Sequence, residues 1–223
     1  IAHDIISLCA NCGKGEESAG DLKACTACKV VKYCNRDCQI AHRPQHKKAC
    51  KKRAAELYDH ELFKDPPSQF DDCPICTLPM PAMSTGRQYK ECCGKMVCMG
   101  CLHAVGIRAQ SNGKLIKCPF CRTPGAYTAK DSNERIKKRI ELGDAFSTFQ
   151  LADCYDGGTN GFAQDFDKSF ELYLRAGELG CADAYCSVGC AYDNGHGVEQ
   201  DKKKAKYYFE LAAMKGCTYS RFN

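Results

Sequence analysis

The stretch that decides the fold covers residues 33–50 and reads YCNRDCQIAHRPQHKKAC. It holds two pairs of possible metal ligands, and three residues separate the members of each pair: Cys34 with Cys38, and His46 with Cys50. Side chains four residues apart lie on one face of an α-helix, so either pair can reach a single ion. The stretch therefore predicts a helix that presents metal ligands, and Asn35 is of a type that favours its N-cap.

Two further ligand pairs precede this stretch, each with the C-x2-C spacing: Cys9 with Cys12, and Cys25 with Cys28. A short C-x2-C turn lets two thiolates reach one ion at about 2.3 Å, and a closed tetrahedral zinc site needs four ligands. Eight ligands therefore predict two complete zinc sites in residues 1–64.

This arrangement resembles the MYND zinc finger over residues 9–50, with all eight ligand positions present. The resemblance implies a small α+β finger with interleaved sites. One zinc would bind Cys9, Cys12, Cys34 and Cys38, and the other would bind Cys25, Cys28, His46 and Cys50. MYND fingers are protein-interaction modules that often take proline-containing peptides.

Residues near the ligands differ from what proline-peptide binding or nucleic-acid binding would need. Arg43 stands where the family usually carries a tryptophan, so an aromatic platform for proline is absent, although Gln39 is kept. His42 reads as a surface or packing histidine, because His46 already completes the ligand set. The basic run at residues 47–53 reads as a solvated helix face rather than a nucleic-acid surface, because few aromatic residues lie near it to stack bases.

Residues 73–124 hold a second group of cysteines: Cys73, Cys76, Cys92, Cys93, Cys98, Cys101, Cys118 and Cys121. They resemble a RING finger with cross-braced sites. The family wiring implies that one zinc binds Cys73, Cys76, Cys98 and Cys101, and that the other binds Cys92, Cys93, Cys118 and Cys121.

The second of these sites departs from the usual RING pattern. Lys95 occupies the position of the usual ligand histidine, so we expect Cys92 to substitute for it, with His103 as the alternative ligand. Neighbouring residues on an extended strand point to opposite faces, so Cys92 and Cys93 need a turned backbone, which Gly94 makes easier.

Three residues of this segment match positions that act in RING ubiquitin ligases. The resemblance implies that Ile75 and Pro119 contact a ubiquitin-conjugating enzyme. It also implies that Arg122 hydrogen-bonds to ubiquitin and orients its thioester, since a planar guanidinium can donate to two acceptors. RING fingers often carry a groove tryptophan, which Val105 or Ile107 would have to replace here.

The last part, residues 131–223, contains an internal repeat of 36 to 37 residues, with copies at about 147–180 and 184–216. The copies resemble the Sel-one-like repeat, a relative of the tetratricopeptide repeat, which implies an all-α antiparallel solenoid. Small residues at the helix crossings would let the backbones approach closely. The pattern Asp131-x2-Glu134 predicts a helix start with a capping box, and Gly143 its end.

Several smaller features belong to this part. Ser220–Asn223 reads as the first turn of a third repeat, so we expect a chain truncated inside the array. His196 is expected to face solvent. The five remaining cysteines are expected to be small packing residues rather than metal ligands: Cys154, Cys181, Cys186, Cys190 and Cys217.

The expected organisation is thus multi-domain. Two small zinc-stabilised α+β fingers, at 1–64 and 73–124, precede an all-α repeat solenoid at 131–223, with linkers at 65–72 and 125–130. Proline pairs and Pro-Gly steps favour such breaks. We expect four Zn²⁺ ions, two per finger.

Composition narrows the function classes. The 20 cysteines among 223 residues, with no apolar run of membrane-spanning length and no secretory leader, favour an intracellular protein, cytoplasmic or nuclear. The formal net charge of +5 counts every cysteine as neutral, and four zinc-thiolate centres would reverse its sign. The formal net charge is therefore weak evidence for a nucleic-acid partner.

Three hypotheses remain, in this order: a RING-type ubiquitin ligase with interaction modules, a non-enzymatic zinc scaffold that binds proteins, and a nucleic-acid-binding protein. The expected partners are proteins, among them a ubiquitin-conjugating enzyme and ubiquitin. No catalytic triad, phosphate loop or open three-ligand zinc site is visible, so no residue of the chain is expected to act as a nucleophile or general base.

Overall fold

The computed structural model describes residues 8–15, 22–64, 70–81, 84–111, 116–126 and 128–221. Residues 65–69 of the expected first linker lie outside these ranges, as do Phe222 and Asn223 of the expected third repeat. The chain divides into two compact units, Ile1–Lys64 and Asp65–Asn223. No helix in the described part of the chain has both the length and the apolar character needed to cross a bilayer.

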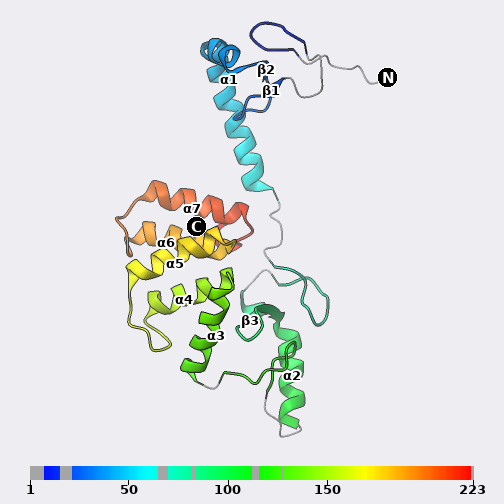
Figure 1. Cartoon of the computed structure of the whole chain (residues 1–223), viewed down its shortest axis with the longest axis vertical. Helices are drawn as coiled ribbons and strands as arrows, with labels where there is room; N and C mark the ends of the chain where they lie inside the picture. The colour runs from blue at the N-terminus through cyan, green and yellow to red at the C-terminus, as the bar shows by residue number, and fades with distance from the viewer. Residues whose placement is uncertain are drawn as a thin grey trace. The chain divides into compact units, whose positions relative to one another are not determined.

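The regular elements of unit 1 are a hairpin of two short strands, each two residues long, and one long helix (Figure 1). Strands β1 (Lys23–Ala24) and β2 (Lys32–Tyr33) pair antiparallel, and α1 (Arg36–Phe63) follows. Asn35 caps α1 as expected, since its Oδ1 accepts a hydrogen bond from the Cys38 amide at 2.8 Å. No residue of α1 is buried. The buried cluster of this unit is made largely of cysteines, namely Cys9, Cys25 and Cys28 with Leu22 and Tyr33.

Unit 2 begins with a cysteine-rich segment built on a hairpin and a helix. Its elements are η1 (Ser84–Gly86), β3 (Arg87–Lys90), β4 (Lys95–Cys98) and α2 (Met99–Ser111). Strands β3 and β4 pair antiparallel, with Arg87 opposite Cys98 and Lys90 opposite Lys95. Gly94 has a φ of +69° in the connecting turn, which fits the turned backbone expected there.

The rest of unit 2 is a stack of helices: α3 (Ala129–Glu141), α4 (Ala145–Gly157), α5 (Phe166–Glu178), α6 (Ala182–Asn194) and α7 (Lys202–Met214), followed by η2 (Tyr219–Arg221). Successive helices of α3–α7 pack on one another (Figure 1). Helices α4 and α6, and likewise α5 and α7, start 37 and 36 residues apart, so the expected repeat is confirmed.

The start of α3 differs from the sequence prediction. We expected Asp131 to cap this helix, but Thr128 is the N-cap and its side chain accepts from the Asp131 amide at 3.1 Å. A threonine N-cap accepts a hydrogen bond from a first-turn amide as well as an aspartate would. The prediction of a capping box that starts at Asp131 is therefore wrong. Gly143 ends the helix as expected, with a φ of +75°.

Small residues set the spacing of the repeat helices, as expected. Ala152, Ala176, Ala184 and Ala212 are completely buried. A Cβ on Gly177 would lie 2.6 Å from the ring of Tyr185, and one on Gly189 would lie 2.7 Å from the ring of Phe209. These glycines therefore let an aromatic ring of the next helix rest directly on the backbone.

A hydrogen-bond network joins the hairpin to the first repeat. The Tyr89 hydroxyl lies 2.8 Å from Asp144 Oδ2 and 2.7 Å from Ser147 Oγ, and Arg139 donates to the same carboxylate. Burial raises the pKa of Asp144, but hydrogen bonds from Ser147, Arg139 and Tyr89 outweigh it and hold that pKa below its ordinary value. The carboxylate is therefore ionised at neutral pH and anchors the junction.

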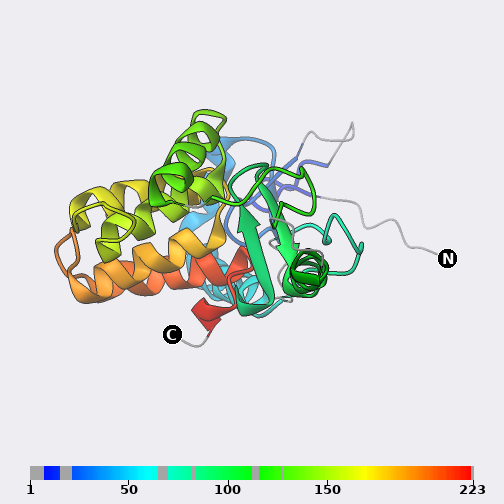
Figure 2. The same cartoon turned by 90° about the horizontal axis from the view of Figure 1, so that it is seen from below.

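Ion pairs and aromatic rings extend this junction. Glu91 pairs with Arg135 at 3.8 Å, and a Cβ on Gly94 would collide with the guanidinium of Arg139. A chain of rings, with centroids 4.9 to 6.2 Å apart, continues from the cysteine-rich segment into the repeats: Phe70, Tyr89, Phe146, Phe149 and Tyr173. The break expected near Pro124-Gly125 thus does not separate two independent bodies. Figure 2 shows the hairpin at one end of the helical stack.

We predict that Tyr89→Phe lowers the free energy of unfolding of the zinc-loaded chain by about 1–3 kcal/mol, because it leaves a buried charged carboxylate short of one donor. Urea titration followed by circular dichroism measures the change. Tyr207→Phe is the control, because the Tyr207 side chain is exposed and its hydroxyl makes no hydrogen bond among the described contacts. Equal stability of the two variants would contradict the role given to Tyr89.

We also predict that Gly177→Ala destabilises unit 2 even though alanine favours helices by about 1 kcal/mol, because the added methyl forces the Tyr185 ring away at a cost of about 1–3 kcal/mol. Gly106→Ala is the matched control in α2, where an added Cβ meets no atom within 4 Å. The control should gain stability in the same denaturation assay. A gain in both variants would show that the helices are not in close contact at Gly177.

Candidate metal centres

The structure gathers sixteen ligand atoms into four clusters, and within each cluster all four atoms lie within 4.8 Å of one another. Unit 1 holds the cluster of Cys9, Cys12, Cys34 and Cys38 and the cluster of Cys25, Cys28, His46 and Cys50. Unit 2 holds the cluster of Cys73, Cys76, Cys98 and Cys101 and the cluster of Cys92, Cys93, Cys118 and Cys121. These groupings coincide with the wiring that the two resemblances implied.

The spacing of the donors fits zinc. A regular tetrahedron with zinc–sulfur bonds of about 2.3 Å has edges of about 3.8 Å. The sulfur atoms of Cys12 and Cys34 are 3.7 Å apart, those of Cys25 and Cys50 are 3.6 Å apart, and those of Cys76 and Cys98 are 3.8 Å apart. In the fourth cluster, the sulfur atoms of Cys92 and Cys121 are 3.4 Å apart and those of Cys93 and Cys118 are 3.9 Å apart. Thiolate and imidazole donors also suit this ion, so the four clusters suggest four zinc sites.

The same backbone turn forms the base of each cluster. The residue four positions after the first cysteine donates its amide to the carbonyl of that cysteine: Gly13 to Cys9, Lys29 to Cys25, Thr77 to Cys73 and Arg122 to Cys118, at 2.8 to 3.0 Å. All four donors have a positive φ between 56° and 73°. The turn directs both sulfur atoms of a C-x2-C pair to one point, which is how the spacing creates half of a site.

Donors to sulfur lower the pKa of one thiol in each cluster to about 6. The backbone amides of Cys12 and Cys34 do so for Cys9, and the amide of Cys28 does so chiefly for Cys25. For Cys73 and Cys121, burial raises the pKa, but hydrogen bonds from nearby amides and, at Cys121, from Thr123 outweigh it. Each cluster thus holds a thiol that is readily ionised, as metal binding requires.

Helix α1 supplies three ligands of unit 1: Cys38, His46 and Cys50. His46 faces its cluster through Nε2, which lies 3.3 Å from the Cys28 sulfur. His42 stays outside the clusters, as expected. Its ring packs against His46, and its Nδ1 lies 3.0 Å from the Tyr33 hydroxyl. His42 therefore supports the ligand histidine rather than joining the site.

In unit 2, Cys92 and not His103 lies with the other donors of the fourth cluster. His103 is exposed on α2, and Lys95 is exposed on β4. The turn at residues 91–94 makes this grouping possible, because the amides of Cys93 and Gly94 both reach the Lys90 carbonyl. The first and third cysteine pairs share one cluster, and the second and fourth share the other. The order of the pairs therefore alternates between the two clusters.

The two residues expected to contact a conjugating enzyme, Ile75 and Pro119, and the one expected to contact ubiquitin, Arg122, lie at the third and fourth clusters. Ile75 is 40% exposed in the turn between Cys73 and Cys76, and Arg122 is exposed directly after Cys121. Pro119 lines a small cavity of about 60 Å³ together with Val105, while the Ile107 side chain is exposed on α2. The left-handed backbone of Arg122 is a property of the shared turn, because Lys29 and Thr77 adopt it too.

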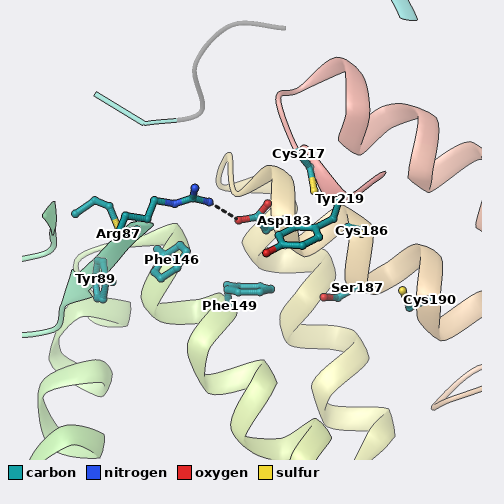
Figure 3. A pocket seen from close by; sticks show the side chains of 11 residues that line it. Arg87, Tyr89, Phe146, Phe149, Asp183, Cys186, Ser187, Cys190, Cys217 and Tyr219 are labelled. Carbon is teal, nitrogen blue, oxygen red and sulfur yellow. Dashed lines mark ion pairs between the residues drawn. The ribbon is translucent and has the colours of Figure 1, made fainter. Parts of the chain in front are cut away.

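A larger cavity of about 300 Å³, here called the repeat cavity, lies where the hairpin meets the repeats (Figure 3). Its wall is mostly apolar, and sequence reasoning missed it because it draws on residues far apart in the chain. Its lining includes Arg87, Phe146, Phe149, Asp183, Ser187 and Tyr219. At its edge, Arg87 forms an ion pair with Asp183 at 3.6 Å and stacks its guanidinium over Phe70.

The cysteines of the repeats are not all packing residues. Cys154, Cys181 and Cys217 are buried, which confirms the expectation for them, and Cys186 is half-buried. Cys190 is exposed and lines the repeat cavity, so the expectation of a buried packing residue was wrong there. His196 is exposed, as expected, and stacks on Phe166.

We predict that Cys92→Ser lowers the zinc content by one ion per chain, because it removes one of four donors of the fourth cluster. His103→Ala should keep the full content. Zinc released by mild acid and measured with a colorimetric chelator gives the stoichiometry. Cys190→Ser serves as a control for the loss of a cysteine outside the clusters. Loss of zinc from His103→Ala instead would reverse the assignment of this ligand.

Comparison with known proteins identifies two modules. Residues 9–50 match the MYND finger family, and residues 145–181 and 182–217 each match the Sel1 repeat. Together these matches leave residues 51–144, which include the third and fourth clusters, outside both families.

Solved structures with some similarity include a Sel1 repeat protein from Oxalobacter formigenes, at 28% identity over 41% of this chain and 37% of that one, with a TM-score of 0.39. The Helicobacter pylori cysteine rich protein B is 25% identical over 42% of this chain and 69% of that one, also with a TM-score of 0.39. A protective antigen of uropathogenic Escherichia coli with an SLR fold is 21% identical over 50% of this chain and 25% of that one, with a TM-score of 0.38.

The chain thus spans little more than a third of the first of these proteins. Its own modules are better defined by the family matches. It combines a MYND finger, a cysteine-rich segment with two further four-cysteine clusters, and two Sel1 repeats stacked as antiparallel helices.

Proposed function

We propose that this chain is a zinc-dependent adaptor that binds other proteins through its finger and its repeats. The observation that carries the proposal is the closure of the metal clusters, since each of the four offers a complete set of four donors. A closed set stabilises structure, whereas hydrolytic zinc keeps one position open for water. Zinc is therefore expected to hold the modules together and to take no part in a reaction.

The repeat cavity supplies a docking position. It is apolar, it opens beside α4 and α6, and a charged pair stands at its edge. An apolar side chain of a partner would lose water on entering it, and the pair of Arg87 and Asp183 would orient the partner's backbone or polar groups. The pair is largely buried, with side-chain exposures of 6% and 18%, so it is the polar part of an otherwise apolar cavity wall.

We predict that Ser187→Phe abolishes capture of the partners that dock on the repeats of the immobilised, zinc-loaded chain, because the added ring fills the repeat cavity. The matched control is Lys203→Phe, which adds the same ring to an exposed position of α7. Proteins crosslinked to the wild type and to the control, but absent with Ser187→Phe, are the expected result in quantitative mass spectrometry. Identical sets for all three would remove the repeat cavity from the proposal. No specific capture by any would end the adaptor proposal.

A RING-type ubiquitin ligase is the second candidate. The alternating order of the cysteine pairs favours it, together with the exposure of Ile75 and the cavity shared by Pro119 and Val105. In this candidate the segment would orient the thioester between a conjugating enzyme and ubiquitin, with Arg122 donating hydrogen bonds to ubiquitin.

A discharge assay with a panel of ubiquitin-loaded conjugating enzymes tests this candidate. The ligase would release ubiquitin, and Ile75→Ala or Arg122→Ala would reduce the rate by an order of magnitude or more, about the scale of one lost transition-state contact. Thr77→Ala is the control, because Thr77 occupies the same turn position as Arg122. Equal loss in that control would indicate damage to the turn. If none of the conjugating enzymes is discharged, the adaptor function is the candidate that remains.

A further inference from the structure

Unit 1 contains a groove along one side of α1, with a volume of about 680 Å³. Thr26 and Ala27, which lie between Cys25 and Cys28, form one wall, and α1 forms the other. We call it the α1 groove. It lies beside the cluster of Cys25, Cys28, His46 and Cys50, so zinc binding fixes both of its walls.

Four cations line the α1 groove: Arg36, Arg43, Lys47 and Lys51. Their spacing of seven, four and four residues places them on one face of the helix, because 3.6 residues make a turn. All four side chains are exposed. They therefore form a row along the groove rather than a scatter around the helix.

These charges are not neutralised within the described part of unit 1. No acidic side chain lines the groove, and no described residue forms an ion pair with any of the four cations. The ion pairs of α1 lie farther along the helix, between Arg53 and Glu56 and between Lys64 and Glu61. The nearby cluster would be a single net anion when it holds zinc, so the groove keeps a strong positive potential.

The apolar contact in the groove is aliphatic. Ile40 lies between Arg36 and Arg43 on α1 and is 57% exposed. The aromatic residue of the lining, Tyr33, is only 3% exposed, so it offers no face on which a nucleic-acid base could stack. Arg43 occupies the middle of the row, where its guanidinium can bind a carboxylate through two hydrogen bonds.

We propose that the α1 groove binds an extended acidic peptide, with carboxylates against the four cations and one apolar side chain against Ile40. The proposal rests on the adaptor function and names the class of partner that the finger takes. From Arg36 to Ala54 the helix rises about 27 Å, which matches roughly eight residues of extended chain.

Fluorescence polarisation of a labelled peptide tests the proposal with the zinc-loaded full chain. The probe is an eight-residue peptide of glutamate and aspartate with one central leucine. Its amide counterpart, in which glutamine and asparagine replace the acids, is the control probe. We expect binding of the acidic probe alone, weakening as salt is raised.

Charge-reversal variants locate the binding. Arg43→Glu and Lys47→Glu should each weaken the acidic probe on the order of tenfold, the effect of one lost and one repulsive contact. Lys48→Glu and Lys52→Glu carry the same change of charge at exposed positions of α1 that do not line the groove, and they should change the affinity little. Arg43→Gln gives a milder test, and the zinc content of every variant confirms that the finger is folded.

Equal weakening by reversals inside and outside the groove lining would overturn the proposal, because it would show unspecific attraction. Equal binding of the amide peptide would also overturn it. Tighter binding of single-stranded RNA, lost in the same variants, would assign the groove to nucleic acid instead. If the acidic probe does not bind, this inference is refuted. If partner capture still depends on Ser187 in that case, the adaptor function is retained.

Discussion

The geometry of four donors around one ion is the constraint on which the two cysteine-rich parts depend. In unit 1, the buried cluster consists mainly of the ligands themselves, and α1 buries no residue of its own. Apolar burial alone is therefore too small to offset the entropy of ordering the chain. Closed zinc sites of this kind contribute on the order of 10–16 kcal/mol of apparent binding, which is enough to decide whether such a finger folds.

In unit 2 the same constraint extends into the repeats. The third and fourth clusters shape the hairpin, and the hairpin carries Tyr89 and Arg87, which reach Asp144 and Asp183 of the helical stack. The first repeat therefore packs against a metal-dependent surface instead of solvent, which is the role that a capping element plays in other repeat arrays. The repeat cavity exists only while both sides of this junction are in place.

Much of this could be predicted from the sequence, because the decisive signals are local. C-x2-C spacing implies a turn with two thiols, and the recurrence of Ala and Gly at 36 to 37 residues implies stacked helices. The grouping of Cys92 with Cys93 followed from the chemistry of Lys95, a poor ligand, and from the freedom of Gly94 to turn the chain.

The remaining features depend on contacts between distant residues. The bond between Tyr89 and Asp144 joins positions 55 residues apart, and nothing near either residue indicates it. Cys190 looked like a packing residue because its neighbours do, and the repeat cavity beside it, which includes distant residues of the hairpin, is not visible in the local pattern. The start of α3 was misplaced because Thr128 and Asp131 both suit a cap, and local pattern could not choose between them.

The left-handed residue of the C-x2-C turns has a consequence for how these segments evolve. Only Gly13 holds this position without cost, whereas Lys29, Thr77 and Arg122 each accept a strain of about 1 kcal/mol. In a turn held only by weak contacts, this strain would favour glycine at the left-handed position. A zinc ion bound at each cluster would outweigh this strain many times over, so a residue other than glycine can hold the position. The residue four positions after the first cysteine of each turn is therefore not restricted to glycine by the fold. Its side chain can instead serve the surface of the protein.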